Sequence, residues 1–517
     1  MRPLDPDSCT RALEARDARF DGVFFVGIAS TGIYCRPICP ARATLRRNRR
    51  FFANAAAAER AGFRPCLRCR PELAPGLARV DAVPRLVQSA AARIAAGALN
   101  GRSVDALARE LGVTSRQLRR VLQQELGVSP VELAQTHRLL VAKHLLTDTR
   151  LPMTQVAYAS GFQSLRRFNA LFHSRYHLNP AALRRRKAAP TRGETDTIRL
   201  TLAYRPPLDW TALLAFLGAR ATPGVERVDD SGYARTVRVG SHTGLVRVTR
   251  DDRSRTGRGA HGAAALRLEI GASLVPALVD LRARVRQLFD LDAEPAAIAA
   301  HLAAAELPVA RIRRGLRVPG AFDGFELAVR AILGQQVTVK GATTLMARLT
   351  ATFGEPVDTG DDELVRLAVS AERLADAGAA RIKTIGLPAA RAQTLHLLAQ
   401  HVAGGALRFD PDADVGAFMR QLEEVPGVGA WTAEYVAMRA LHWPDAFPAT
   451  DLVLRRNAGN LTATQLRRAA DRWRPWRAYA AMQLWMRDLR EPTEAPSRHP
   501  HPNETSHVPT HRRGHIG

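Results

Sequence analysis

The chain has 517 residues, which is too long for one ordinary hydrophobic core and predicts about three or four domains. Its apolar fraction of 46% excludes wholesale disorder, and its net charge of +26 favours nucleic acid as a partner, although arginine richness can also reflect genome base composition. A membrane span is excluded because no run of about 20 apolar residues occurs. The N-terminal residues include acids and lack the apolar segment of a secretory signal, so we expect a cytoplasmic protein. We also expect it to be a monomer that associates with the nucleoid.

Residues 1–78 contain all five cysteines, with short apolar segments between glycines and prolines that predict short strands around a small site. Cys9 stands apart and is expected to be a small buried apolar residue. The other four form two close pairs at the spacing that a tetrahedral zinc ion requires. One Zn²⁺ is therefore expected, either as a reactive centre or as a closed site that only stabilises the domain. The expected ligands are Cys35, Cys39, Cys66 and Cys69.

The residues around these pairs resemble the Ada DNA methylphosphotriester repair domain. The resemblance covers about the first 75 residues and is carried by Ser30–Cys39 and Gly62–Cys69. It implies that Cys35 accepts a methyl group from an alkylated backbone phosphate, because zinc keeps thiolates ionised and nucleophilic. Transfer would remove one negative charge and weaken repulsion from DNA, which implies tighter promoter binding. No base regenerates the sulfur, so each molecule would react once.

Residues 79–186 are helical by the spacing of their apolar residues and contain an internal repeat. The segment Gly112–Pro130 is echoed by Gly161–Pro180, and each copy indicates a helix-turn-helix. The pair resembles the AraC-type DNA-binding domain, which implies recognition helices near Ser115–Gln124 and Ser164–Phe172. Promoter DNA would be the ligand, and RNA polymerase is a candidate partner. Five arginines of these helices could contact DNA or simply keep an exposed face soluble: Arg116, Arg119, Arg120, Arg166 and Arg167.

The pattern changes after a polar linker at 187–195. Residues 196–288 contain alternating segments such as IRLTLAY and ALRLEI, which predict strands of an antiparallel sheet. From about Leu281 to Leu489 the chain is helical by pattern, and residues 289–490 are assigned to the helical domain. The tail at 491–517 has too few apolar residues to pack, so we expect it to be disordered.

A glycine turn within the helical region, Val425–Ala433, resembles the helix-hairpin-helix motif of DNA repair enzymes. Gly427 and Gly429 permit a tight turn that directs backbone amides at a DNA phosphate. Asp451 follows at the distance at which that superfamily carries a catalytic carboxylate. Such a carboxylate would stabilise an oxocarbenium-like sugar and orient water, although an aspartate in front of a helix can also serve as its N-cap.

Residues 196–490 as a whole resemble 3-methyladenine DNA glycosylase II of the AlkA type, most clearly at Phe325–Val337 and Arg472–Ala480. Bifunctional relatives carry a nucleophilic lysine just after the hairpin glycines. Trp431 stands at that place, which implies a monofunctional glycosylase that leaves the strand intact.

The same resemblance places Trp431, Tyr435 and Trp485 around the flipped base. Aromatic faces attract cationic alkylated purines, although each of these residues could instead be an ordinary core aromatic. Gln336 takes the position of the wedge residue that fills the gap left by the flipped base. The AlkA type has a leucine there, so the role of Gln336 is open.

The predicted fold class is multidomain α+β: a small zinc domain, an AraC-type double helix-turn-helix domain, an antiparallel-sheet subdomain and an all-helical helix-hairpin-helix glycosylase domain. The expected function is hydrolysis of the N-glycosidic bond of alkylated purines in double-stranded DNA, with stoichiometric methyl transfer and transcription activation. The alternatives are a regulator whose C-terminal domain only binds DNA, and a zinc-stabilised scaffold. Repair of O6-alkylguanine is not expected, because the sequence lacks a Pro-Cys-His-Arg segment.

Overall fold

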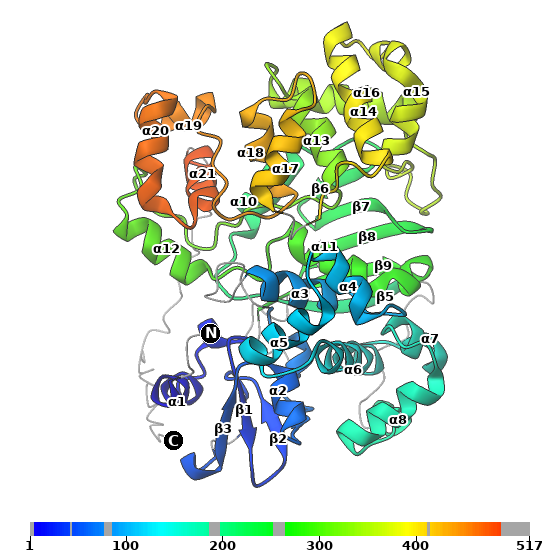
Figure 1. The fold of residues 1–517 in the computed structure, drawn as a ribbon, viewed down its shortest axis with the longest axis vertical. Helices are drawn as coiled ribbons and strands as arrows, with labels where there is room; N and C mark the ends of the chain where they lie inside the picture. Colours follow the sequence, from blue (N-terminus) through cyan, green and yellow to red (C-terminus); the bar gives the residue numbers. More distant parts are fainter. Residues whose placement is uncertain are drawn as a thin grey trace, which may run out of the picture.

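The computed structural model describes residues 5–41, 44–76, 85–185, 197–251, 264–410 and 414–487 (Figure 1). The predicted linker at 187–195 and the predicted tail at 491–517 lie outside these residues. The zinc and helix-turn-helix segments form one half of the molecule, and the larger sheet with the C-terminal helices forms the other. Within the described part, no helix combines the length and the apolar character needed to cross a bilayer.

The N-terminal domain is a small sheet flanked by helices. Its strand order is β3-β1-β2-β4, in which β1 is antiparallel to both neighbours and β4 runs parallel to β2. Gly27 is required in β1, because a side chain there would collide with the rings of Phe52 and Phe63. Cys9 is buried beside Phe24, which confirms its predicted apolar role. The elements are α1 (Pro6–Glu14), β1 (Phe25–Ile28), β2 (Ile33–Cys35), β3 (Arg49–Phe52), α2 (Ala55–Arg60) and β4 (Arg64–Pro65).

Two helix-turn-helix units follow and are connected by the long helix α6. Each recognition helix, α5 and α8, begins at an N-cap whose hydroxyl accepts a backbone N–H, Thr114 for α5 and Ser164 for α8. Both helices run further than predicted, because their last residues, Leu126 and Tyr176, are buried in the core. The helices are α3 (Arg85–Ala95), α4 (Val104–Glu110), α5 (Ser115–Leu126), α6 (Pro130–Asp148), α7 (Met153–Ala159), α8 (Leu165–Tyr176) and α9 (Pro180–Arg185).

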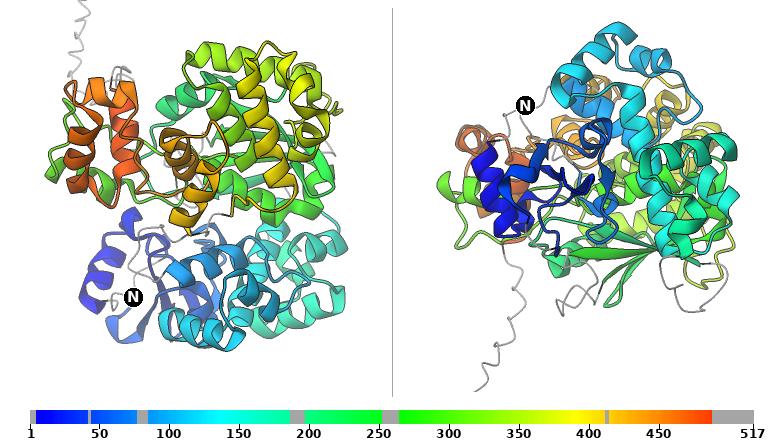
Figure 2. Two further views of the ribbon diagram at one scale, coloured as in Figure 1. Left: turned by 45° about the horizontal axis from the view of Figure 1, so that its top comes forward. Right: turned by 90° about the horizontal axis from the view of Figure 1, so that it is seen from below.

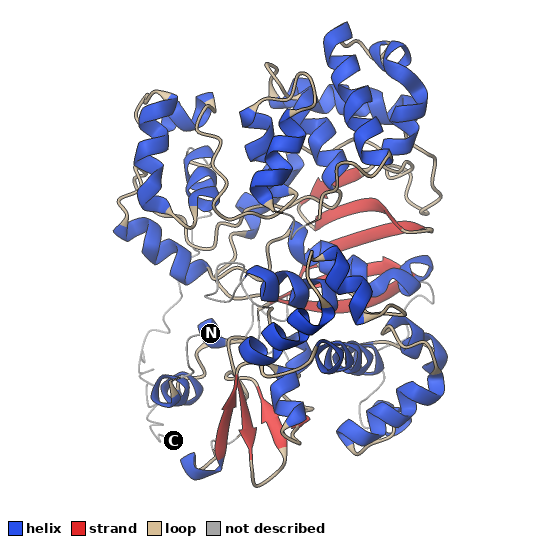
Figure 3. Ribbon diagram, in the orientation of Figure 1, coloured by secondary structure: helices blue, strands red, loops and turns tan. Residues whose placement is uncertain are grey.

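The second half begins with an antiparallel sheet of order β5-β9-β8-β7-β6 (Figure 3). The alternating segments form strands as predicted, and their inward residues, such as Leu200 and Leu268, are buried. Strand β6 and helix α10 were not predicted from the sequence, because β6 is short and α10 is apolar on nearly every side. The elements are β5 (Thr197–Ala203), α10 (Trp210–Gly218), β6 (Glu226–Asp229), β7 (Gly232–Val239), β8 (His242–Arg250) and β9 (Ala265–Gly271).

Helix α11 packs into the core of the larger sheet, and the helices after it build two lobes with separate apolar cores. Phe325 and Leu395 belong to one core, and Leu454 and Leu466 belong to the other. Trp485 packs against both cores, so it lies where the lobes meet. The helices are α11 (Leu278–Leu288), α12 (Pro295–Ala304), α13 (Gly324–Leu333), α14 (Val339–Phe353), α15 (Ala371–Lys383), α16 (Ala389–Ala403), α17 (Val415–Glu423), α18 (Ala430–Arg439), α19 (Leu452–Asn457), α20 (Ala463–Ala470) and α21 (Arg477–Trp485).

The two halves of the molecule are packed against each other (Figure 2). Buried residues of α6 to α8 and of the larger sheet belong to one apolar cluster. Arg205, which follows β5 and is buried, donates to the carbonyl oxygens of Asp21 at 3.1 Å, Gly76 at 2.7 Å and Asp292 at 2.5 Å. One guanidinium of the second half therefore holds two backbone groups of the zinc domain.

Candidate metal centre and active site

The four predicted zinc ligands lie together in one buried cluster. Cys35 ends β2 and Cys39 follows in a turn, while Cys66 and Cys69 come after β4, which pairs with β2. Their sulfur atoms lie within 4.8 Å of one another, and the residues are between 1% and 8% exposed. A tetrahedron with Zn–S bonds of about 2.3 Å separates its sulfurs by about 3.8 Å, so this donor set fits the ion. The four cysteines form a zinc site.

Backbone N–H groups distinguish the four sulfurs. Cys66 accepts two such bonds, at 3.3 and 3.5 Å, Cys69 accepts one at 3.3 Å, and Cys39 also accepts one. Among the described residues, no N–H donates to the sulfur of Cys35. Hydrogen bonds to a ligand sulfur withdraw electron density from it. This pattern of hydrogen bonds favours Cys35 as the most nucleophilic sulfur of the set.

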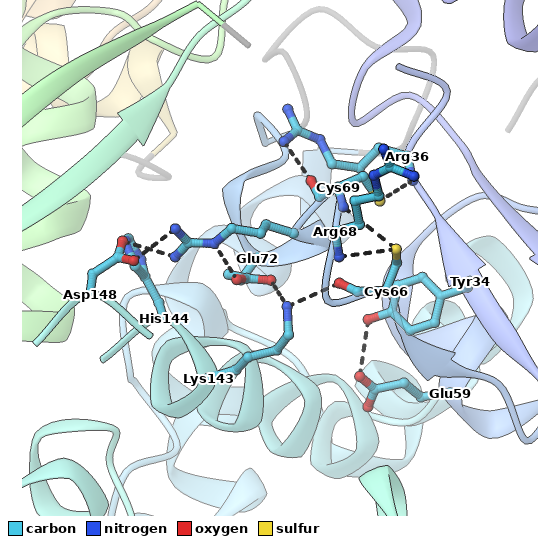
Figure 4. Close-up of polar contacts among 11 residues, drawn as sticks. Tyr34, Arg36, Glu59, Cys66, Arg68, Cys69, Glu72, Lys143, His144 and Asp148 are labelled. Atoms are coloured by element: carbon cyan, nitrogen blue, oxygen red, sulfur yellow. Dashed lines mark hydrogen bonds and ion pairs between the residues drawn. The ribbon is translucent and has the colours of Figure 1, made fainter. Parts of the chain in front are cut away.

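A buried ionic network joins the zinc site to helix α6 (Figure 4). The carboxylate of Glu72 pairs with Arg70 at 2.9 Å and with Lys143 of α6, and Lys143 also donates to the carbonyl of Cys66 at 3.2 Å. Burial alone would raise the pKa of Glu72, but Lys143 and Arg70 lower it to about 2. The carboxylate is therefore ionised, and it fixes the helix-turn-helix domain to the loop that carries two zinc ligands.

Glu59 makes a second polar contact between the same two domains. It accepts hydrogen bonds from the hydroxyl of Tyr34 at 3.1 Å and from the hydroxyl of Thr136 on α6 at 2.8 Å (Figure 4 shows the first). Burial raises the pKa of Glu59 to about 7, although both hydrogen bonds act in the opposite direction. This contact is sensitive to pH near neutrality, unlike the Glu72 network.

The five predicted DNA-contacting arginines are all exposed on the two recognition helices. Arg119 bonds the hydroxyl of Ser115 at 3.4 Å, within its own helix. Exposure suits both interpretations, DNA contact and simple solubility, so the DNA-contacting role of these side chains stays a prediction. The residues are Arg116, Arg119 and Arg120 on α5, and Arg166 and Arg167 on α8.

Asp451 lies between the two C-terminal lobes. Its Oδ1 accepts the backbone N–H groups of Val453 and Leu454, both at 2.9 Å, so it is the N-cap of α19. The indole N–H of Trp431 donates to Oδ2 at 2.9 Å, and that of Trp485 donates to Oδ1 at 3.1 Å. The two interpretations of Asp451 are therefore compatible, since the capping carboxylate also faces the predicted pocket.

The three predicted pocket aromatics form one group around this carboxylate. The rings of Trp431 and Tyr435 are stacked, with centroids 5.3 Å apart and planes at 7°. Trp485 meets Tyr435 edge-on, at 6.1 Å and 65°. Tyr435 is buried, whereas both tryptophans are half-buried. The group thus presents aromatic faces beside a carboxylate, which suits a flipped and damaged base.

Two arginines that lie next to the aromatic group were not identified from the sequence. Arg439 donates to the hydroxyl of Tyr435 at 2.7 Å, and Arg220 lies 3.8 Å from the ring centre of Phe216. Burial alone would raise the pKa of Tyr435, but Arg439 and Arg220 lower it below its ordinary value. Only the one-turn spacing from Tyr435 to Arg439 could have indicated this contact.

The glycine turn joins α17 to α18, as the hairpin motif requires. Gly427 has a φ of +91°, and a side chain there would lie 2.3 Å from the hydroxyl of Thr394. Gly427 and Gly429 are exposed, and in the described chain their N–H groups donate to no backbone carbonyl. Gln335 bonds the Gly427 carbonyl at 3.0 Å, and Gln336, exposed with a φ of +58°, follows it. The predicted wedge thus lies in a loop that is fixed to the hairpin.

Comparison with known proteins identifies the same parts. The "Probable bifunctional transcriptional activator/DNA repair enzyme AlkA" of Mycobacterium tuberculosis is 40% identical over 490 residues, which cover 93% of this chain and 96% of the relative. The chain belongs to this family. Four family models match it in order: the metal binding domain of Ada (8–72), a helix-turn-helix domain (107–186), the AlkA N-terminal domain (199–323) and the HhH-GPD superfamily base excision DNA repair protein (329–491).

Two relatives from Escherichia coli match the family's separate parts. The chain is 37% identical over 295 residues to "DNA-3-methyladenine glycosylase 2", covering 57% of this chain and 99% of that protein. It is 51% identical over 71 residues to the "Bifunctional transcriptional activator/DNA repair enzyme Ada", covering 14% of this chain and 20% of that protein. The predicted fold class and the three predicted resemblances, to the Ada, AraC-type and AlkA-type domains, are confirmed.

Proposed function

We propose that this protein repairs alkylated DNA at two sites, with Asp451 as the glycosylase carboxylate and Cys35 as the methyl acceptor. The observation that carries the proposal is the carboxylate of Asp451, which accepts hydrogen bonds from two indoles beside Tyr435. The matching base excision repair model and the relatives named as DNA repair enzymes support the same function.

The glycosylase reaction follows from the charge of Asp451. Cleavage of an N-glycosidic bond builds positive charge on the sugar as the base departs. No basic side chain of the described residues pairs with Asp451, so its negative charge is available to stabilise that sugar and to orient the attacking water. Trp431 stands where bifunctional relatives carry an amine, so the product is an abasic site in an intact strand.

Recognition of the damaged nucleotide is shared between the pocket and the hairpin. The flipped base would stack against Trp431, Tyr435 and Trp485, whose faces attract a cationic purine such as 3-methyladenine. The exposed N–H groups of the hairpin glycines would bind a phosphate of the damaged strand. Gln336 would occupy the gap in the base stack, with less apolar contact than a leucine.

Methyl transfer uses the second site. Zinc, when bound, keeps the four sulfurs ionised at neutral pH. The sulfur of Cys35 attacks the methyl carbon of a methylphosphotriester, so that a C–S bond forms, the C–O bond breaks and its electron pair stays on the phosphate oxygen. Cys35 becomes a neutral thioether, which lowers the negative charge of the domain and its repulsion from DNA. The absence of an N–H donor to the sulfur of Cys35 among the described residues supports this assignment.

The helix-turn-helix pair would use this change to activate transcription. The exposed arginines of α5 and α8 would bind promoter DNA more tightly after methylation, and RNA polymerase is the partner that we propose at the promoter. Both activities place the protein on DNA, and we expect it at the nucleoid.

One incubation tests both sites. The full-length protein is mixed with duplex DNA that carries labelled methyl groups, and released bases and labelled protein are counted together. We expect free 3-methyladenine and one label per protein molecule. Label without free bases would mean that the C-terminal domain only binds DNA, and free bases without label would refute the role of Cys35. Borohydride should trap no protein on DNA, since a trapped adduct requires an amine nucleophile.

A further inference from the structure

Three arginines place their charges near the hydroxyl of Tyr435, and we call Arg220, Arg330 and Arg439 the arginine cluster. Arg439, on α18, donates to that hydroxyl at 2.7 Å. Arg220, just after α10, and Arg330, on α13, lie close enough for their charges to lower the pKa of the same phenol. The cluster therefore places positive charge next to a predicted wall of the base pocket.

No acid of the described residues neutralises Arg439 or Arg220. Arg439 is buried and donates to the hydroxyl of Tyr435 and to the carbonyls of Pro319 and Gly320, at 2.8 and 2.9 Å. Arg220 donates to the carbonyl of Phe216 at 3.2 Å and lies over its ring. Within the described residues, neither guanidinium has a carboxylate at salt-bridge distance. A buried guanidinium without an acid is unusual in a protein interior.

The acids nearest to Arg330 are already engaged elsewhere. Glu326 forms its ion pair with Arg235 at 2.8 Å, and Glu226 lies 3.7 Å from the same Arg235 and accepts the hydroxyl of Tyr233 at 2.5 Å. One nitrogen of Arg330, Nη1, is buried and has no hydrogen-bond partner. The cluster thus keeps an excess of positive charge and an unused donor.

This charge affects different bases in opposite directions. When the N-glycosidic bond breaks, its electron pair goes to the base nitrogen. A base that is already cationic leaves as a neutral molecule, whereas a neutral base leaves with a negative charge that lasts until it is protonated. Nearby guanidiniums stabilise the developing anion and disfavour a bound cation. The aromatic faces of the pocket act the other way, because they attract cations.

We propose that the arginine cluster is a specificity-determining element that shifts excision towards neutral damaged purines and away from cationic ones. The inference rests on the proposed glycosylase function and concerns the same pocket. The cluster would act on the base through Tyr435, because the ring of Tyr435 stacks on Trp431 and its hydroxyl accepts a hydrogen bond from Arg439.

The test compares one neutral and one cationic substrate. Single-turnover excision rates are measured for duplexes that contain hypoxanthine or 7-methylguanine, with the full-length protein. Arg220→Met should lower the hypoxanthine to 7-methylguanine rate ratio by about ten-fold, the effect of one unit charge at the pocket wall. Arg220→Lys keeps the charge and should retain most of the ratio.

Matched variants separate charge from structure. Arg381→Met removes a guanidinium that lies 5.5 Å from the ring of Phe353, outside the cluster, and should leave the ratio unchanged. If Arg220→Met does not fold, Arg330→Met provides the same measurement. A ratio within two-fold of wild type in a folded variant would overturn the inference. Wild-type protein that releases neither of these bases nor 3-methyladenine would instead refute the proposed function.

Discussion

Replacement of Asp451 by asparagine tests the glycosylase carboxylate with the smallest change of shape. The side-chain oxygen of asparagine can still accept from the N–H groups of Val453 and Leu454, so the cap of α19 is kept. The new NH₂ group, however, would face the indole N–H of Trp431, which then loses its acceptor. Because Trp431 is only half-buried, its unsatisfied donor costs about 1 kcal/mol, so the variant should fold with slightly lower stability.

The catalytic loss in this variant is larger than its loss of stability. A carboxylate about 5 Å from a sugar cation, at an effective dielectric of about 20, contributes about 3 kcal/mol to the transition state. Loss of that charge corresponds to a rate that is lower by roughly 150-fold. The loss of water orientation adds to this figure, so we expect a decrease of at least about two orders of magnitude.

The assay measures single-turnover release of 3-methyladenine from alkylated duplex DNA, together with binding to a duplex that carries an abasic analogue. Binding should change little, because the hairpin glycines and Gln336 are untouched. Asp323→Asn is the matched control, since Asp323 is the N-cap of α13 and accepts the N–H of Glu326 at 2.9 Å, away from the pocket aromatics. A folded Asp451→Asn protein with a rate within five-fold of wild type would refute the catalytic assignment.

Three further predictions concern the N-terminal half. Cys35→Ser should abolish methyl transfer from phosphotriester DNA, while Cys9→Ser should keep it; mass spectrometry of the protein detects the added methyl. Lys143→Met leaves Glu72 buried beside one cation fewer and should lower the free energy of unfolding by about 3 kcal/mol, measured by urea denaturation. The pKa of Glu59 is raised to about 7 in the native state, so between about pH 4.5 and 7 the native state binds more protons than the unfolded state. The contribution of Glu59 to the free energy of unfolding is therefore fully present below about pH 4.5 and is lost as the pH rises towards 7. Glu59→Gln should remove that loss, measured by denaturation at pH 5 and 7.5.

The sequence predicts best what depends on local spacing. The ligand pairs Cys35 with Cys39 and Cys66 with Cys69 could be recognised because a short loop alone brings two sulfurs to one metal. The helix-turn-helix repeat was visible because glycine turns and helix periodicity are local patterns. Gly427 was also predictable, since its positive φ is a property of the turn itself.

The sequence predicts least what depends on contacts between distant segments. Arg220 and Arg439 are 219 residues apart in the chain, and only the packing of α10 against α18 brings both to Tyr435. The two possible roles of Asp451 could not be separated from sequence, because capping is set by the next three residues and the indole contacts by segments 20 and 34 residues away. The resemblance favours the catalytic role, because the family carries a carboxylate at this distance from the hairpin.

A short path of contacts connects the two repair sites. Arg36, adjacent to the proposed methyl acceptor Cys35, pairs with the carboxylate of Asp21 at 2.8 Å, and the carbonyl of Asp21 accepts from Arg205 of the glycosylase half. The matching E. coli glycosylase corresponds to that half alone, so an attached zinc domain is not needed to form such a fold. In this chain, removal of the zinc domain would leave buried Arg205 with only one of these three carbonyl acceptors, Asp292. The glycosylase half is therefore adapted to its fused partner, and its activity is best measured in the full chain.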